Sequence, residues 1–124
     1  MRDDKFKIVV IAKEFSFNLN SVLCRFPNSE KVLKDKIKSL IYEIIEYIYE
    51  TNYMPLDKYR EERIKYQIKI LAKASMIDCL LEESYRKGYI TENIFHEKVK
   101  ELSELSMRIK GWISYEKNNS TRSS

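Results

Sequence analysis

The chain has 124 residues, of which 44% are hydrophobic and 34% charged, and its 23 basic and 19 acidic residues give a net charge of +4. This length suits one domain, and a basic chain tends toward acidic partners: nucleic acid, an anionic membrane or an acidic protein face. No apolar run approaches the roughly 20 residues that span a bilayer, and no signal peptide is apparent, so we expect a cytoplasmic protein without a membrane partner.

The first predicted helix covers residues 5–24. Only two glycines and two prolines are present in the chain, which favours long helices over many short strands. The apolar residues of this segment recur at steps of three and four, as one helical stripe requires. They are Ile8, Ile11, Phe15, Leu19, Val22 and Leu23. β-Branched residues leave a strand as the alternative for residues 7–11. Pro27 ends the helix, and Asn28 or Ser29 is expected to cap the next one.

The second predicted helix covers residues 29–52, and the third covers residues 57–86. The second carries one clean stripe, which consists of Leu33, Ile37, Leu40, Ile41, Ile44 and Ile48. Pro55 separates the two helices, and Asp57 is expected to cap the third. The third helix carries two apolar rows: Ile64, Ile68, Leu71, Ser75 and Cys79, and beside them Ile70, Ala74, Ile77 and Leu81. Two rows are broader than one neighbouring helix needs, so we expect this face to contribute to an oligomer.

The fourth predicted helix covers residues 92–115. Thr91 is expected to cap it, and Gly88 suits the left-handed position that ends the preceding helix. Its stripe consists of Phe95, Val99, Leu102, Ile109 and Ile113. Residues 116–124 are polar and are predicted to form a disordered tail. The fold class is therefore all-α: an antiparallel up-down-up-down four-helix bundle that forms a single domain over residues 1–115.

Side chains that support catalysis are scarce. An enzyme needs a positioned acid, base, nucleophile or metal, and His96 is the only histidine. Cys24 and Cys79 form no metal-binding motif and are expected to be small buried residues in a reducing compartment. The acidic residues around Glu43 are more typical of a solvated helix face than of a carboxylate site. We therefore expect a protein that is not an enzyme, with no catalytic residue, no cofactor and no metal site.

Basic residues form two helical rows. Lysines recur at steps of three and four along the second and third helices, and single arginines lie before the second helix and near the end of the fourth. Like charges one turn apart repel each other and so destabilise the helix slightly. That cost favours the interpretation that the lysine rows contact an anionic partner over the alternative that they are a solvated face. No base-reading module is present, so nucleic acid should be bound mainly through its phosphates and without strong sequence preference. The predicted contact residues are Arg25, Lys31, Lys34, Lys38, Lys65, Lys69, Lys73 and Arg108.

Two motifs occur in a recognisable order. The sequence FPNSE at residues 26–30 opens the second helix, and RIKGW at residues 108–112 lies near the end of the fourth. Residues 25–53 and residues 71–113 resemble the accessory variability determinant proteins of diversity-generating retroelements. That family has a Phe-Pro-Lys-Ser-Glu-type turn and a closing Gly-Gly-Trp-like motif. One difference is that Lys110 replaces the first glycine here. Either motif alone is weak, and the pair in this order is fairly specific.

The resemblance implies a four-helix bundle that assembles as a ring-like homopentamer. It also implies a basic surface that engages nucleic acid and the reverse transcriptase of the element. That enzyme copies a template RNA into mutated cDNA, and a protein of this family assists without catalysing. The expected partners are therefore a reverse transcriptase, RNA or DNA bound without strong sequence specificity, and further copies of the chain.

Two alternative functions stay open. The related ribosomal intervening-sequence proteins share the Phe-Pro turn, although they usually continue with a Pro-Asn-Ile-Ala-Glu-Gly-like stretch that this chain lacks. A bundle of that kind would associate with the ribosome or with RNA and have no retroelement role. A small oligomeric scaffold that binds only protein is the other alternative. A neighbouring reverse transcriptase gene with paired variable and template repeats would favour the retroelement function over both.

Overall fold

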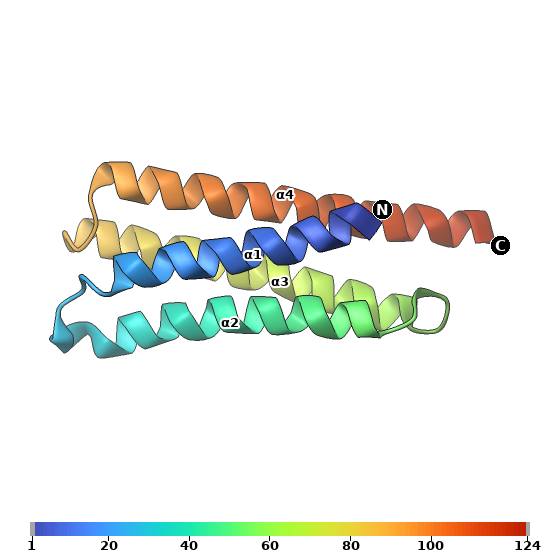
Figure 1. Cartoon of the computed structure of the whole chain (residues 1–124), viewed down its shortest axis with the longest axis horizontal. Helices are drawn as coiled ribbons and strands as arrows, with labels where there is room; N and C mark the ends of the chain where they lie inside the picture. The colour runs from blue at the N-terminus through green and yellow to red at the C-terminus, as the bar shows by residue number, and fades with distance from the viewer. Residues whose placement is uncertain (1, 124) are drawn as a thin grey trace.

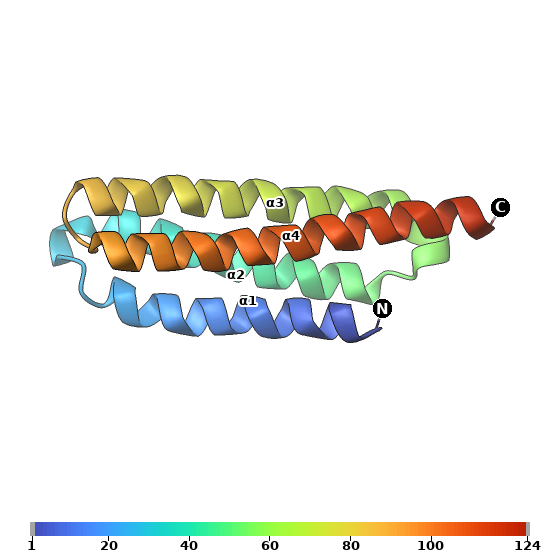
Figure 2. The same ribbon diagram turned by 90° about the horizontal axis from the view of Figure 1, so that it is seen from above.

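The computed structural model describes the backbone of residues 2–123 and the side chains of residues 7–118. This part of the chain is all-helical and contains no strand, so the strand alternative for residues 7–11 is wrong. The elements are α1 (Arg2–Leu23), the short 3-10 turn η1 (Asn28–Glu30), α2 (Lys31–Tyr53), α3 (Leu56–Arg86) and α4 (Glu92–Ser123). The α1–α2 and α3–α4 connections lie at one end of the molecule and the α2–α3 connection at the other (Figures 1 and 2).

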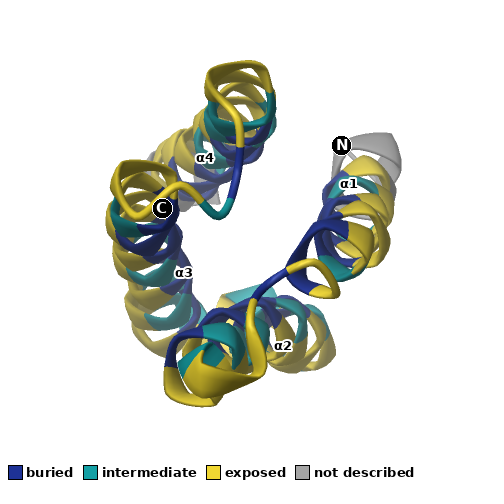
Figure 3. Ribbon diagram, turned by 90° about the vertical axis from the view of Figure 1, so that its left-hand side faces the viewer, coloured by how far each residue is buried: buried dark blue, intermediate teal, exposed yellow. Residues whose placement is uncertain are grey.

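The four helices form a four-helix bundle in which each helix packs against two neighbours. α2 contacts α1 and α3, and α4 contacts the same two helices. α1 and α3 therefore lie diagonally opposite each other, as do α2 and α4, and the buried sides of all four helices face inward (Figure 3). A side chain on α2 and one on α4 consequently border different surfaces of the molecule.

The predicted apolar stripes supply most of the core. Ile37 and Ile44 of α2 and Ile77 of α3 are fully buried. The two apolar rows of α3 are buried to different extents, because only one of them faces the bundle axis. The row that contains Ile77 is buried, whereas the row that contains Ile68 stays half-buried or exposed. An apolar strip of α3 therefore remains at the surface.

The helices end at the breaks that Pro27, Pro55 and Gly88 indicated. Of the predicted side-chain caps, some are confirmed and others are wrong. Gly88 has a φ of 81°, and Thr91 Oγ1 accepts a hydrogen bond of 3.2 Å from the backbone N–H of Ile94. Both features were expected. Asp57 is not the N-cap of α3, because that helix begins at Leu56 and Asp57 lies in its first turn.

The expected cap of α2 by Asn28 or Ser29 is also wrong. Pro27 is extended, with φ −62° and ψ 150°, and the next three residues form η1. α2 continues directly from that turn, and no side chain makes a capping hydrogen bond at the start of either element. Backbone turn geometry thus replaces the expected side-chain cap.

α4 extends past its predicted end at residue 115. The helix runs to Ser123, and its last turns project beyond the ends of the other helices (Figure 1). Glu116 is buried, so the prediction of a disordered tail at 116–124 is wrong where that tail was to begin. Residues 116–118 continue the helix because Glu116 has a buried partner in α3. The side chains from residue 119 onward, and residue 124 altogether, lie outside the described residues.

The turn before α2 is tied to the α3–α4 connection. Glu30 accepts hydrogen bonds from the Tyr89 hydroxyl and from Lys87 Nζ, the second at 3.2 Å. The Phe26 ring lies 5.4 Å from the ring of Tyr89. The hydrogen bond from Tyr89, and then that from Lys87, favours the charged carboxylate, so the pKa of Glu30 falls below its ordinary value of 4.5.

Glu30 should therefore contribute to the dependence of stability on acid pH. A carboxylate whose pKa is lower in the folded chain stabilises it above the unfolded pKa, and this contribution is lost as the pH falls through the folded pKa. We expect Glu30→Gln to lose less free energy of unfolding than the unchanged chain between about pH 5 and pH 3, as measured by urea denaturation. Glu104→Gln, at an exposed position of α4, is the matched control. Identical pH profiles for Glu30→Gln and the unchanged chain would contradict this role.

Candidate nucleic-acid interface

Two of the predicted lysines of α3 gather around a pair of tyrosines at the junction with α2. The rings of Tyr47 and Tyr66 meet edge to face, with their centroids 5.3 Å apart. Lys69 Nζ lies 5.7 Å from both centroids, and Lys73 Nζ lies 5.5 Å from that of Tyr47. Ring faces attract ammonium groups, so these lysine side chains are held along the junction between the two helices. We call these four residues the tyrosine–lysine cluster.

One lysine of the cluster is partly neutralised. Lys73 Nζ lies 3.2 Å from a carboxylate oxygen of Glu43 on α2. Glu43, which was expected on a solvated acidic face, is therefore the partner of a lysine. Lys65 lies one helical turn before Lys69, and both are exposed. An anionic ligand at this junction would meet Lys65 and Lys69 first.

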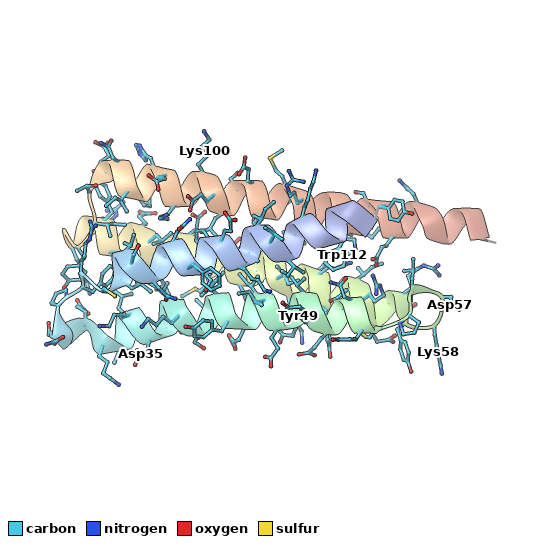
Figure 4. All side chains as sticks on the ribbon, viewed as in Figure 1. Asp35, Tyr49, Asp57, Lys58, Lys100 and Trp112 are labelled. Atoms are coloured by element: carbon cyan, nitrogen blue, oxygen red, sulfur yellow. The ribbon has the colours of Figure 1, made fainter. Side chains whose placement is uncertain are left out.

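The lysine row of α2 borders the opposite side of that helix. Lys13 Nζ of α1 lies 5.6 Å from the ring centroid of Tyr49, so Tyr49 is on the side of α2 next to α1 (Figure 4). Tyr47 is on the side next to α3. At 3.6 residues per turn, Lys31 lies five turns before Tyr49 and Lys38 about three turns before it, so both share the α1 side. The two predicted rows therefore border different grooves.

The remaining predicted contact residues are scattered. Lys34 is half-buried on α2. Arg25 is exposed in the turn after α1, and Arg108 is exposed on α4, which does not contact α2 in the described part of the chain. The eight predicted residues consequently form no single surface. Lys69 and Lys73 meet at the tyrosine–lysine cluster and Lys65 lies one turn before them, whereas the other five predicted residues lie elsewhere on the bundle.

A buried ion pair that the sequence analysis missed lies near the α2–α3 connection. Arg63 Nε donates to Glu116 Oε1 at 3.1 Å, and Arg63 Nη2 donates to Glu116 Oε2 at 2.5 Å. Arg63 Nη1 donates to the backbone carbonyls of Thr51 and Met54 at the end of α2. The Trp112 ring lies 5.9 Å from the guanidinium carbon. One arginine of α3 thus holds the end of α2 and the last turns of α4 together.

The sequence contains a signal for this pair. The buried row of α3, followed backward from Ile70 by steps of three and four, reaches Gln67 and then Arg63. The stripe of α4, followed forward from Ile113 by three, reaches Glu116. Both rows continue with polar residues that are buried, whereas a stripe defined by hydrophobicity stops at the last apolar residue. The pair is enclosed in the bundle, so we assign it to the fold and not to the interface.

A small hollow lies between α3 and α4. Its volume is about 220 Å³, and its lining residues are Ala74, Ser75, Asp78, Val99, Leu102, Ser103 and Ser106. Burial raises the pKa of the Asp78 carboxyl, and the charge of Glu82 raises it further. Among the side chains of residues 7–118, no three His, Cys, Asp or Glu residues are placed to hold a metal ion.

The two cysteines are free and exposed. The expectation that they are buried is wrong for both. Cys79 belongs to the outer row of α3, and Cys24 follows the last buried position of α1. In the described part of the chain, no helix combines the length and the apolar character that crossing a membrane requires.

Comparison with known proteins identifies a fold relative. No protein-family model and no curated protein sequence matches the chain. A solved structure of a protein of unknown function from the S23 ribosomal protein family of Bacteroides thetaiotaomicron matches with a TM-score of 0.79. The match covers 90% of this chain and 98% of that one, at 18% sequence identity. Such a likeness shows a shared helical fold.

Proposed function

We propose that this chain is a non-catalytic accessory protein that binds nucleic acid and the reverse transcriptase of a diversity-generating retroelement. The observation that carries nucleic-acid binding is the tyrosine–lysine cluster together with Lys65. It offers ammonium groups for phosphates beside aromatic rings, a combination that suits sequence-tolerant binding. The net charge of +4 supports an anionic partner. The resemblance of residues 25–53 and 71–113 to the accessory variability determinant family supports the choice of enzyme.

In this proposal the protein is an antiparallel up-down-up-down bundle whose copies associate in a ring, five in number as in the family it resembles. The outer apolar row of α3 supports association, because Ile68 is 52% exposed. Met76 is also exposed on this helix. Apolar surface of this kind is removed from water when a second copy covers it. Light scattering of the tag-free protein measures the number of chains directly.

Charge reversal at the tyrosine–lysine cluster tests the proposal. Lys65→Glu combined with Lys69→Glu should weaken the binding of RNA and reduce its dependence on salt. Each lost phosphate contact reduces the steepness of the negative slope of log K against log salt by about 0.7 for a single strand and about 0.9 for a duplex. Fluorescence anisotropy at several salt concentrations measures both quantities. Lys73 is left unchanged, because a carboxylate there would face Glu43.

The matched control makes the same change of net charge elsewhere. Lys100 and Lys110 are exposed on α4 and lie outside the cluster, and Figure 4 shows Lys100 on the outer side of that helix. Lys100→Glu with Lys110→Glu should lower RNA affinity less than the cluster variant does. An equal effect of the two double variants would mean that only net charge matters. That result would remove the α2–α3 junction from the interface.

A second candidate function is favoured by the fold relative. An RNA- or ribosome-associated bundle with no retroelement role agrees with the likeness to a protein from the S23 ribosomal protein family. Affinity purification of this chain from its own cells distinguishes the two. Recovery of a reverse transcriptase favours the accessory function, whereas recovery of ribosomal subunits without that enzyme favours the alternative. Recovery of proteins alone, with no nucleic acid, favours a protein-only scaffold.

A further inference from the structure

A line of exposed aromatic side chains lies along α2 on the side next to α1. Tyr42, Tyr49 and Tyr53 are separated by seven and four residues, which places them on one line of the helix. Tyr42 is 53% exposed and Tyr53 is 85% exposed. On α1, Phe17 is 68% exposed and lies one turn beyond Lys13, the residue that contacts Tyr49. Large rings are normally buried in a core or an interface, so this exposure indicates a contact surface.

Lysines border the same line. Lys13 lies beside the Tyr49 ring, and Lys31 and Lys38 continue the line toward the start of α2. Two acids lie on this side as well: Glu46, and Asp35, which is 3.3 Å from Lys31. That pair is exposed and contributes little, so the ammonium group of Lys31 can exchange its partner for a phosphate. We call these three lysines, with Phe17, Tyr42, Tyr49 and Tyr53, the aromatic face.

We propose that the aromatic face binds single-stranded nucleic acid, with bases stacked on its rings and phosphates held by its lysines. Stacking on side chains is open to unpaired bases, whereas the bases of a duplex already stack on one another. Every base has a π face, so such binding selects single strands without selecting sequence. At 1.5 Å per residue, Tyr42 and Tyr53 are about 16 Å apart along α2. That length matches about five bases at 3.4 Å each.

This inference rests on the proposed function and divides it between two surfaces. The lysines at the α2–α3 junction hold phosphates of any nucleic acid, and the aromatic face, on the other side of α2, selects unpaired bases. Lysines alone would favour the duplex, because its phosphate charge density is higher. A preference for single strands therefore depends on the rings.

Removal of three of the four rings of the aromatic face tests the inference. The variant Phe17→Ala, Tyr42→Ala, Tyr49→Ala is compared with the unchanged chain by fluorescence anisotropy, using a short unstructured RNA strand and the duplex of that strand with its complement. Each lost stacking contact lowers affinity by about 5- to 150-fold. We expect the variant to bind the strand at least about 125-fold more weakly and the duplex nearly as before. The salt slope should not change, because the lysines remain.

Two further variants make the result specific. Tyr42→Phe with Tyr49→Phe keeps both rings and should bind the strand as the unchanged chain does. Val32→Ala, Tyr59→Ala and Met107→Ala together remove three exposed apolar side chains outside the aromatic face. This control should alter neither affinity. Circular dichroism checks that each variant keeps its helices.

The outcomes separate this inference from the proposed function. If the unchanged chain binds neither the single strand nor the duplex, both the proposed function and the inference are wrong. If the Lys65 and Lys69 variant loses binding while the ring-deleted variant binds the strand normally, only the inference is wrong. Equal loss of strand and duplex would also overturn it. A lower solution mass for the ring-deleted variant would show that the face joins two copies of the chain, and the inference would again be wrong.

Discussion

Arg63→Ala is expected to lower the free energy of unfolding by about 3–5 kcal/mol. The substitution leaves the carboxylate of Glu116, which is 1% exposed, buried without its cation. It also removes the donor to the carbonyls of Thr51 and Met54. Urea denaturation measures the loss. Arg86→Ala is the matched control, because its pair with Glu82 is exposed and should contribute less than about 1 kcal/mol.

The double variant Arg63→Met, Glu116→Leu separates pairing from packing. Replacing both members of a buried ion pair with apolar side chains of similar size is often neutral or stabilising, because the cost of removing two charges from water disappears. We therefore expect the double variant to be more stable than Arg63→Ala and to recover most of the loss. If Arg63→Ala is no less stable than Arg86→Ala, the pair does not hold the three helices together.

Ending the chain after Tyr115 should have an effect of similar size, about 3–5 kcal/mol. This truncation removes Glu116 and leaves the guanidinium of Arg63 buried without its carboxylate. The residues removed are those that the sequence predicted to be a disordered tail. The free energy of unfolding in urea again gives the loss.

Ending the chain after Asn118 is the control for this truncation. It shortens α4 but keeps Glu116 and its partner, so its stability should stay close to that of the full chain. Equal stability of the two truncated chains would contradict the role of Glu116. It would also return the end of the domain to residue 115.

The helices could be predicted from the sequence because their signals are local. The apolar spacing of each segment gave the four helices, and Pro27, Pro55 and Gly88 gave the breaks between them. The end of α4 could not be found in this way. Glu116 is polar and is held by Arg63, which is 53 residues away in the chain. Such a contact depends on how α3 and α4 pack together, so it cannot be predicted from the hydrophobic periodicity of either helix.

The candidate interface was predictable in part. Spacing alone placed Lys65, Lys69 and Lys73 on one line of α3, and the structure retains that line. The neighbours of the line depend on which helix packs beside α3. Only the tertiary structure shows that Tyr47 lies under two of these lysines and that Glu43 neutralises one of them. The same limit explains why the lysines of α2 were grouped with them although they border another groove.

The affinity of the unchanged chain for RNA as a function of salt tests the central claim most directly. Fluorescence anisotropy with a single strand and with a duplex gives the two affinities. We predict that both are measurable at low salt and that log K falls linearly with log salt, as counterion release requires. The absence of binding to either RNA at low salt would contradict the account. Binding that does not change with salt would contradict it equally, because the lysines would then not be contacting phosphates.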